Sequence, residues 1–306
     1  MLICAVLAAA AALAGCGDGA RAGDERGDAT LRVVATTPHA GDFARQVGGS
    51  RVRVDTLVPP GADPHDYEPR PSDARAVAEA DVVVRSGGEI DAWLDDVVKS
   101  AGTDAEQVSL IDGVPTRKGD EGGVDPHWWQ DPRNVVRATG RLRAAFTSAD
   151  PDGAAAYSAA ARRYERAVRS LDEEIAACMA QIPAERRRLV TNHDAFGYLA
   201  ARYDIRILGS IIPALSTNAQ PSAGDIRRLV AAIRREHVTT IFPESALNQR
   251  LERAVARDAG AKVGPALYAD TLGKPGTEGE TYLGALRHDA GAMVAGFGGR
   301  CDLPRP

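Results

Sequence analysis

Residues 52–69 read VRVDTLVPPGADPHDYEP, an alternating apolar run that leads into a proline-rich loop with one histidine. The run at 52–57 predicts a β-strand, because every second side chain would face a core. Three prolines before His65 and Pro69 after it leave the loop few backbone conformations. Such a loop loses little further entropy when it is ordered, so it holds one imidazole in a defined place. Taken alone, the segment is more simply a surface turn whose histidine titrates; the recurrence of the motif favours a ligand.

Strand and helix patterns alternate along the chain from residue 31 onward. Strand patterns rich in valine and leucine occur at 31–35, 52–57, 81–85, 107–111, 188–191, 205–208, 239–242 and 262–267. Helical patterns occur at 42–47, 72–80, 90–100, 134–147, 195–202, 223–235 and 247–258. Two rounds of this alternation predict an α/β protein of two lobes, each a mostly parallel sheet flanked by helices.

A long helical stretch separates the two rounds. Neither glycine nor proline occurs between residues 154 and 181, and apolar side chains recur there at helical spacing. One continuous helix of about 28 residues would reach roughly 40 Å and join the lobes as a rigid connector; two shorter packed helices are the alternative. We therefore expect an N-terminal lobe at 31–152, a linking helix at 153–182 and a C-terminal lobe at 183–306.

The N-terminus has the features of an export signal. Residues 2–14 are apolar, with the length of a signal-peptide core and too short to span a bilayer as a helix. They end in Leu13-Ala14-Gly15-Cys16, which resembles the lipobox of a bacterial lipoprotein, although no lysine or arginine precedes the run. We expect a signal peptide at 1–15, a lipid on Cys16 and a flexible tether at 16–30, which would anchor the protein at the extracytoplasmic face of the cell membrane. The alternative is an ordinary secretory signal with an incidental cysteine.

Export also bears on the remaining cysteines. The chain has four, of which Cys4 belongs to the signal and Cys16 to the lipid. In an oxidising compartment the other two, Cys178 and Cys301, form a candidate disulfide, with two separate buried thiols as the alternative.

Composition excludes some functions. The net charge is −5, the isoelectric point is about 5.7, and 44% of residues are hydrophobic against 26% charged. These values are ordinary for a globular protein and make nucleic acid an unexpected partner.

Three further segments place a histidine or an aspartate beside the end of a predicted strand. They are DPHWWQDP at 125–132, LVTNHDAF at 189–196 and ALYADTL at 266–272. Ligands of open α/β sheets collect at the carboxyl ends of the strands, where His65, His127, His193 and Asp270 all lie. Three imidazoles and one carboxylate complete a tetrahedral shell for a transition metal.

The other histidines receive simpler interpretations. His39 follows the first strand, and we expect it to line the cleft wall or begin a helix. His237 ends a charged helix and His288 lies between Arg287 and Asp289, so both are expected on helix surfaces.

The chain resembles the metal-binding lipoproteins of zinc and manganese ABC importers, the cluster A-I solute-binding proteins. The resemblance rests on VVATT at 33–37, GADPHDYEP at 61–69, DPHWWQDP at 125–132, HDAFGY at 193–198, FPES at 242–245, YADTLG at 268–273 and TYL at 281–283. It implies two α/β lobes joined by one long helix, with the metal between them on His65, His127, His193 and Asp270. It also implies capture and delivery to a membrane permease without enzymatic activity, and we expect a monomer.

The residue types of the four expected ligands indicate which metal ion the site favours. Manganese importers of this kind commonly have glutamate at the position of His193, so a third imidazole favours Zn²⁺, with Mn²⁺ as the alternative cargo. Residues 113–124 lack the histidine-rich loop of many zinc members, and Glu244 is a candidate support for a ligand histidine. A surface adhesin remains an alternative role. A zinc hydrolase is disfavoured, because four protein ligands leave no open position for water.

Overall fold

The computed structural model describes residues 31–119, 122–301 and 303 of the 306-residue chain. The predicted signal peptide at 1–15, the tether at 16–30 and the lipid-bearing Cys16 lie outside the described residues. Within the described part, no helix combines the length and the apolar character that a membrane crossing requires.

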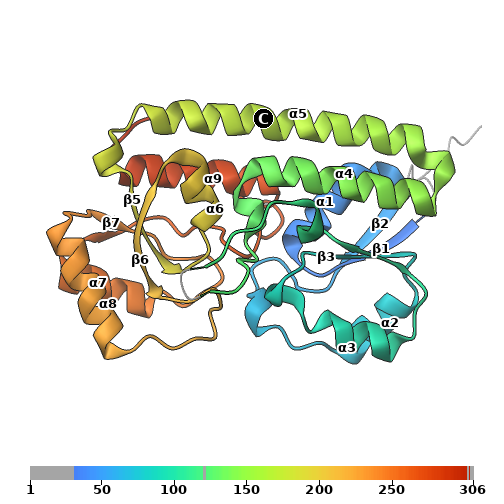
Figure 1. The fold of residues 1–306 in the computed structure, drawn as a ribbon, viewed down its shortest axis with the longest axis horizontal. Helices are drawn as coiled ribbons and strands as arrows, with labels where there is room; N and C mark the ends of the chain where they lie inside the picture. The colour runs from blue at the N-terminus through green and yellow to red at the C-terminus, as the bar shows by residue number, and fades with distance from the viewer. Residues whose placement is uncertain (1–30, 120–121, 302, 304–306) are drawn as a thin grey trace, which may run out of the picture.

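The N-terminal lobe contains one parallel sheet. Its strands are β1 (Leu31–Ala35), β2 (Val52–Thr56), β3 (Val82–Arg85) and β4 (Glu106–Ser109), in the order β2-β1-β3-β4. Helices α1 (Pro38–Gly48) and α4 (Pro132–Ala149) cover one face, and α2 (Pro71–Ala78) and α3 (Leu94–Ala101) cover the other (Figure 1). The sheet therefore contributes buried side chains to two separate hydrophobic cores, one on each of its faces.

The alternation of side chains in β1 supplies both cores. Val33 and Ala35 belong to the core under α1 and α4, whereas Val34 packs with Val77 of α2 and Leu94 of α3. Because successive side chains of a strand point to opposite faces, a short run of apolar residues is buried on both sides.

The C-terminal lobe contains two pairs of parallel strands in place of one four-stranded sheet. Strands β5 (Arg188–His193) and β6 (Arg206–Ile212) pair in parallel, as do β7 (Thr240–Ile241) and β8 (Lys262–Val263). The amide of Phe242 donates to the carbonyl of Val190 at 2.9 Å and connects the two pairs. The helices of this lobe are α6 (Gly197–Tyr203), α7 (Ala223–Arg235), α8 (Arg250–Ala259) and α9 (Tyr282–Gly296).

One helix, α5 (Ala154–Ala180), runs along both lobes (Figure 1). It has 27 residues and packs on α1 and α4 at one end and on α9 at the other. Tyr157, Tyr164 and Leu171 are buried on its inner face, at helical spacing. The predicted fold class, two α/β lobes with a long connecting helix, is confirmed.

Two local features differ from the expectations. The bounds of helix α9 were not predicted, although His288 was expected on a helix surface, because small and apolar residues occupy most sides of this helix and leave no polar face to give a helical period. The strand expected at 262–267 ends at Val263, since Pro265 has no amide hydrogen to donate to a ladder. Pairing resumes only as an isolated parallel bridge between Glu244 and Leu267.

Candidate metal centre

The four predicted ligand residues come from four separate loops or strand ends that meet between the lobes. His65 lies in a 3-10 turn (Pro64–Asp66) after β2, and His127 directly precedes a 3-10 turn (Trp128–Gln130). His193 is the last residue of β5, and Asp270 follows the bridge at Leu267. The structure thus brings all four together, with one ligand atom from each lying within 4.8 Å of the others.

Distances within this group suit a single small cation. The Nε2 atom of His127 lies 3.4 Å from Nε2 of His65 and 3.3 Å from Nε2 of His193. Carboxylate oxygens of Asp270 lie 3.4 Å from His65 Nε2, 3.3 Å from His127 Nε2 and 3.0 Å from His193 Nε2. Four ligands bound tetrahedrally at about 2.0–2.1 Å from one ion would be about 3.3 Å apart. An ion at the centre would therefore need little rearrangement of these side chains.

Hydrogen bonds behind two of the imidazoles orient them toward the centre. Nδ1 of His127 lies 2.8 Å from Asp125, and Nδ1 of His193 lies 2.8 Å from Glu244. Each carboxylate accepts the Nδ1 proton, so Nε2 is the ring atom that is turned inward and available to a metal. Glu244 was expected from the sequence as a candidate support for a ligand histidine, and in the structure Glu244 contacts His193.

The charges of the site also suit a cation. Burial alone would raise the pKa of Asp270, but the neighbouring His193 and His127 lower that pKa well below its usual range. Burial likewise opposes ionisation of Asp125, yet its contacts with His127 and with Arg117 lower its pKa. One oxygen of Asp270, Oδ1, is buried without a hydrogen-bond donor, as expected of an atom reserved for a metal.

The sequence did not reveal how Asp270 and Asp125 are held. The indole of Trp129 and the amide side chain of Gln130 both donate to the carbonyl of Ala269, at 2.9 and 3.0 Å, and fix the segment before Asp270. Arg117 donates to Asp125 at 2.8 Å. The repeated Asp-Pro-His pattern was the available signal for Asp125; Arg117 stands in a loop without a recognisable motif.

The remaining histidines lie outside the cluster. His39 is buried at the start of α1 and stacks on Trp129 with ring centroids 4.9 Å apart, and burial lowers its pKa to about 3. His237 is exposed just beyond α7. His288 lies on α9, as expected of a helix position, with a partly exposed ring whose Nε2 lies 3.0 Å from the carbonyl of Ala266.

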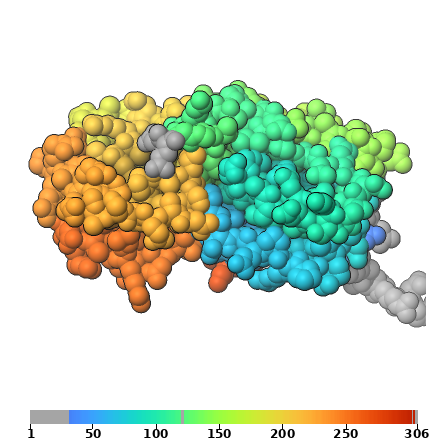
Figure 2. Space-filling view, turned by 60° about the horizontal axis from the view of Figure 1, so that its bottom comes forward, coloured from blue at the N-terminus to red at the C-terminus, as the bar shows by residue number. Residues whose placement is uncertain are grey.

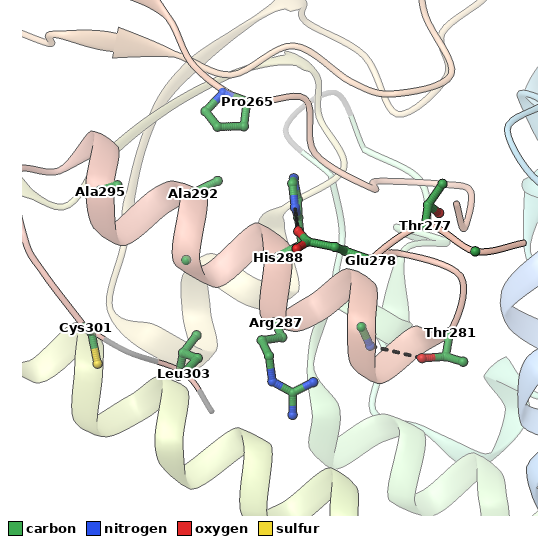
Figure 3. Close-up of a pocket in the computed structure, with 13 residues that line it drawn as sticks. Pro265, Thr277, Glu278, Thr281, Arg287, His288, Ala292, Ala295, Cys301 and Leu303 are labelled. Atoms are coloured by element: carbon green, nitrogen blue, oxygen red, sulfur yellow. Dashed lines mark hydrogen bonds and ion pairs between the residues drawn. The ribbon is translucent and has the colours of Figure 1, made fainter. Parts of the chain in front are cut away.

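Of two cavities, one reaches a candidate ligand residue and the other contains none of the four. A cleft of about 920 Å³ reaches His65 and is lined by both lobes, including Glu89, Asp112 and Asn218. A second cavity of about 710 Å³ follows α9 and contains none of the four ligand residues (Figure 3). Near it a disulfide joins Cys178 to Cys301, with Cα atoms 5.7 Å apart.

Comparison with known proteins gives concordant matches. Residues 33–296 match the family described as zinc-uptake complex component A, periplasmic. The chain is 32% identical over 286 residues to the manganese-binding lipoprotein MntA of Halalkalibacterium halodurans, covering 93% of this chain and 94% of the relative. Against the manganese-binding lipoprotein MntA of Bacillus subtilis it is 33% identical over 302 residues, with 96% and 97% covered. The solved periplasmic zinc-binding protein TroA from Treponema pallidum has a TM-score of 0.82 and 25% identity, and covers 89% of this chain and 100% of its own.

Proposed function

The chain belongs to the family of zinc-uptake component A proteins, and we propose that it captures a divalent transition-metal ion between its lobes and delivers it to the membrane permease of an ABC importer. Members of this family are solute-binding proteins and the chain is not an enzyme. The observation that carries the proposal is the convergence of four ligand residues, His65, His127, His193 and Asp270, whose ligand atoms all lie within 4.8 Å of one another. His127 and Asp270 each lie 3.0 to 3.4 Å from the other three.

We propose Zn²⁺ as the cargo. Three imidazole nitrogens with one carboxylate form a ligand set that zinc accepts in a tetrahedral shell, whereas manganese favours oxygen ligands and higher coordination numbers. Mn²⁺ is the second candidate, because both curated relatives named above are manganese-binding lipoproteins. Both oxygens of Asp270 face the imidazoles, which also suits an ion of higher coordination number.

Metal analysis of the mature protein, without the expected signal peptide, tests this proposal. Protein purified without added ions is analysed for bound metals, and its affinities for Zn²⁺ and Mn²⁺ are measured by competition with one chelator. We expect His127→Ala to lose zinc affinity by at least about a hundredfold, since loss of this imidazole leaves the ligand shell incomplete. His237→Ala, at an exposed position outside the cluster, is the matched control. If the His127→Ala and His237→Ala proteins bind Zn²⁺ with equal affinity, the proposed set of four ligands is excluded.

We further propose that Cys16 carries a lipid that holds the protein at the extracytoplasmic face of the membrane, as the relatives named lipoproteins support. The lobes would then be residues 31–152 and 183–306, joined by 153–182, and the protein would act as a monomer. Because α5 packs on helices of both lobes, metal exchange would use small lobe displacements instead of a wide hinge opening.

A further inference from the structure

The loop that bears His65 is bonded to the opposite lobe at three points. The amide of Gly61 donates to Oγ1 of Thr271 at 2.8 Å. The hydroxyl of Thr217 donates to Oδ2 of Asp63 at 2.6 Å, and the side-chain amide of Asn218 donates to the carbonyl of His65 at 2.7 Å. All three bonds cross between the lobes, which meet across the middle of the molecule (Figure 2).

Asp63 connects one of these bonds to the ligand itself. Its Oδ1 accepts from the amide of His65 at 2.9 Å, which caps the 3-10 turn Pro64–Asp66, while its Oδ2 accepts from Thr217. One carboxylate therefore joins the backbone of a ligand histidine to the facing lobe. Hydrogen bonds to an ionised acceptor are stronger than those between neutral groups.

His65 depends on this connection more than the other two histidines do. The rings of His127 and His193 are oriented by Asp125 and Glu244, which bond their Nδ1 atoms. Among the described residues, no carboxylate supports Nδ1 of His65 in this way. Its ring position is therefore set through its backbone, where Asp63 holds the amide and Asn218 holds the carbonyl.

We propose that Asp63 is a positioning residue for the metal, which transmits the lobe-to-lobe contact with Thr217 to His65. This inference rests on the proposed function. When the bridge is intact, the imidazole of His65 is held against the other three ligands. When the lobes part, the same separation that breaks the Thr217 bond frees the turn, so detachment of His65 and opening of the cleft occur together. The bridge thus acts mainly on metal release.

The test measures zinc dissociation from the exported chain, by rapid mixing of the zinc-loaded protein with excess fluorescent chelator. Asp63→Ala removes both bonds, and Thr217→Val removes the hydroxyl while retaining the shape. We expect each to raise the dissociation rate about tenfold or more, as for loss of a hydrogen bond to a charged group. Thr217→Ser restores a donor and should return the rate to within about twofold of the parent.

Asp66→Ala is the matched control, because Asp66 lies in the same turn next to His65 but is exposed. It removes the same charge and should leave the rate within about twofold, because an exposed carboxylate contributes little. The double variant of Asp63 and Thr217 should release zinc no faster than Asp63→Ala alone, since both changes break one bridge. Faster zinc release, beyond any loss of stability in thermal unfolding of the metal-free forms, distinguishes this role from a purely structural one. A loss of stability with unchanged zinc release would overturn the bridge.

The outcomes separate the two proposals. If the parent binds no transition metal tightly, the proposed function fails. If the parent and Asp66→Ala hold zinc and Asp63→Ala releases it at the same rate, the function stands and the bridge is overturned. The bridge would also be overturned if the increases in zinc dissociation rate caused by the Asp63 and Thr217 substitutions multiplied in the double variant.

Discussion

At the scale of single residues, the identity of one ligand bears on the choice of metal. His193 is fully buried, and Glu244 holds its ring. We expect His193→Glu to narrow the preference for zinc over manganese, because it replaces a nitrogen ligand with an oxygen ligand and brings a second carboxylate into the shell. Chelator competition with both metals measures the change. If the parent already binds Mn²⁺ within about tenfold of Zn²⁺, a gap of about 1.4 kcal/mol, the assignment of zinc is wrong.

Protons should compete with the metal at the same residues. An imidazole must be neutral to coordinate, and its usual pKa is about 6.5. Burial lowers the pKa of His193, but the charges of Glu244 and Asp270 outweigh burial and raise it well above that value in the metal-free site. A raised pKa means that a proton must leave when the metal binds, so affinity should fall as pH falls through that raised value and should already be much reduced at about pH 6. Affinity that is flat between about pH 7 and 5 would instead indicate a carboxylate-dominated site.

At the scale of elements, the linking helix is tied to the segment after α9. Cys178 lies in the last turn of α5, and its partner Cys301 follows the C-terminal helix at a sequence separation of 123. Closing a loop of this length restricts the unfolded chain, so the bond should stabilise the folded protein by about 2 to 4 kcal/mol. Denaturant unfolding of Cys301→Ser, compared with the parent, measures the loss, and metal affinity should stay unchanged because neither cysteine lies at the cleft. Two free thiols in protein produced under oxidising conditions would contradict the pairing.

At the scale of the whole molecule, the metal should act as a connection between the lobes. His65 and His127 belong to the N-terminal lobe, and His193 and Asp270 to the C-terminal lobe. Because the unfolded chain does not hold these ligands together, bound zinc stabilises the folded state alone, by about 2.7 kcal/mol at free zinc a hundred times the dissociation constant. Calorimetric unfolding should therefore show one transition that moves to higher temperature with zinc. A transition temperature independent of zinc would contradict binding between the lobes.

Local sequence patterns were sufficient to predict much of the fold and the four candidate ligand residues. Short runs rich in valine and leucine located β1 and β2, and the absence of glycine and proline from 154 to 181 indicated the continuous helix α5. Histidine or aspartate just beyond apolar runs selected the four residues that the structure brings together. These features depend on neighbours within a few positions, which the sequence displays directly.

The tertiary structure alone decided the contacts that hold the ligands. Glu244 meets His193 across 51 residues, and Thr217 meets Asp63 across 154. The extent of helix α9 likewise became recognisable only from its packing against α5, because its small residues carry no helical period of their own. Such pairings depend on how two lobes and a connecting helix pack in space, and no spacing along the chain encodes that packing. Residue identity therefore determined which atoms could bind a metal, and chain topology determined what holds those atoms in place.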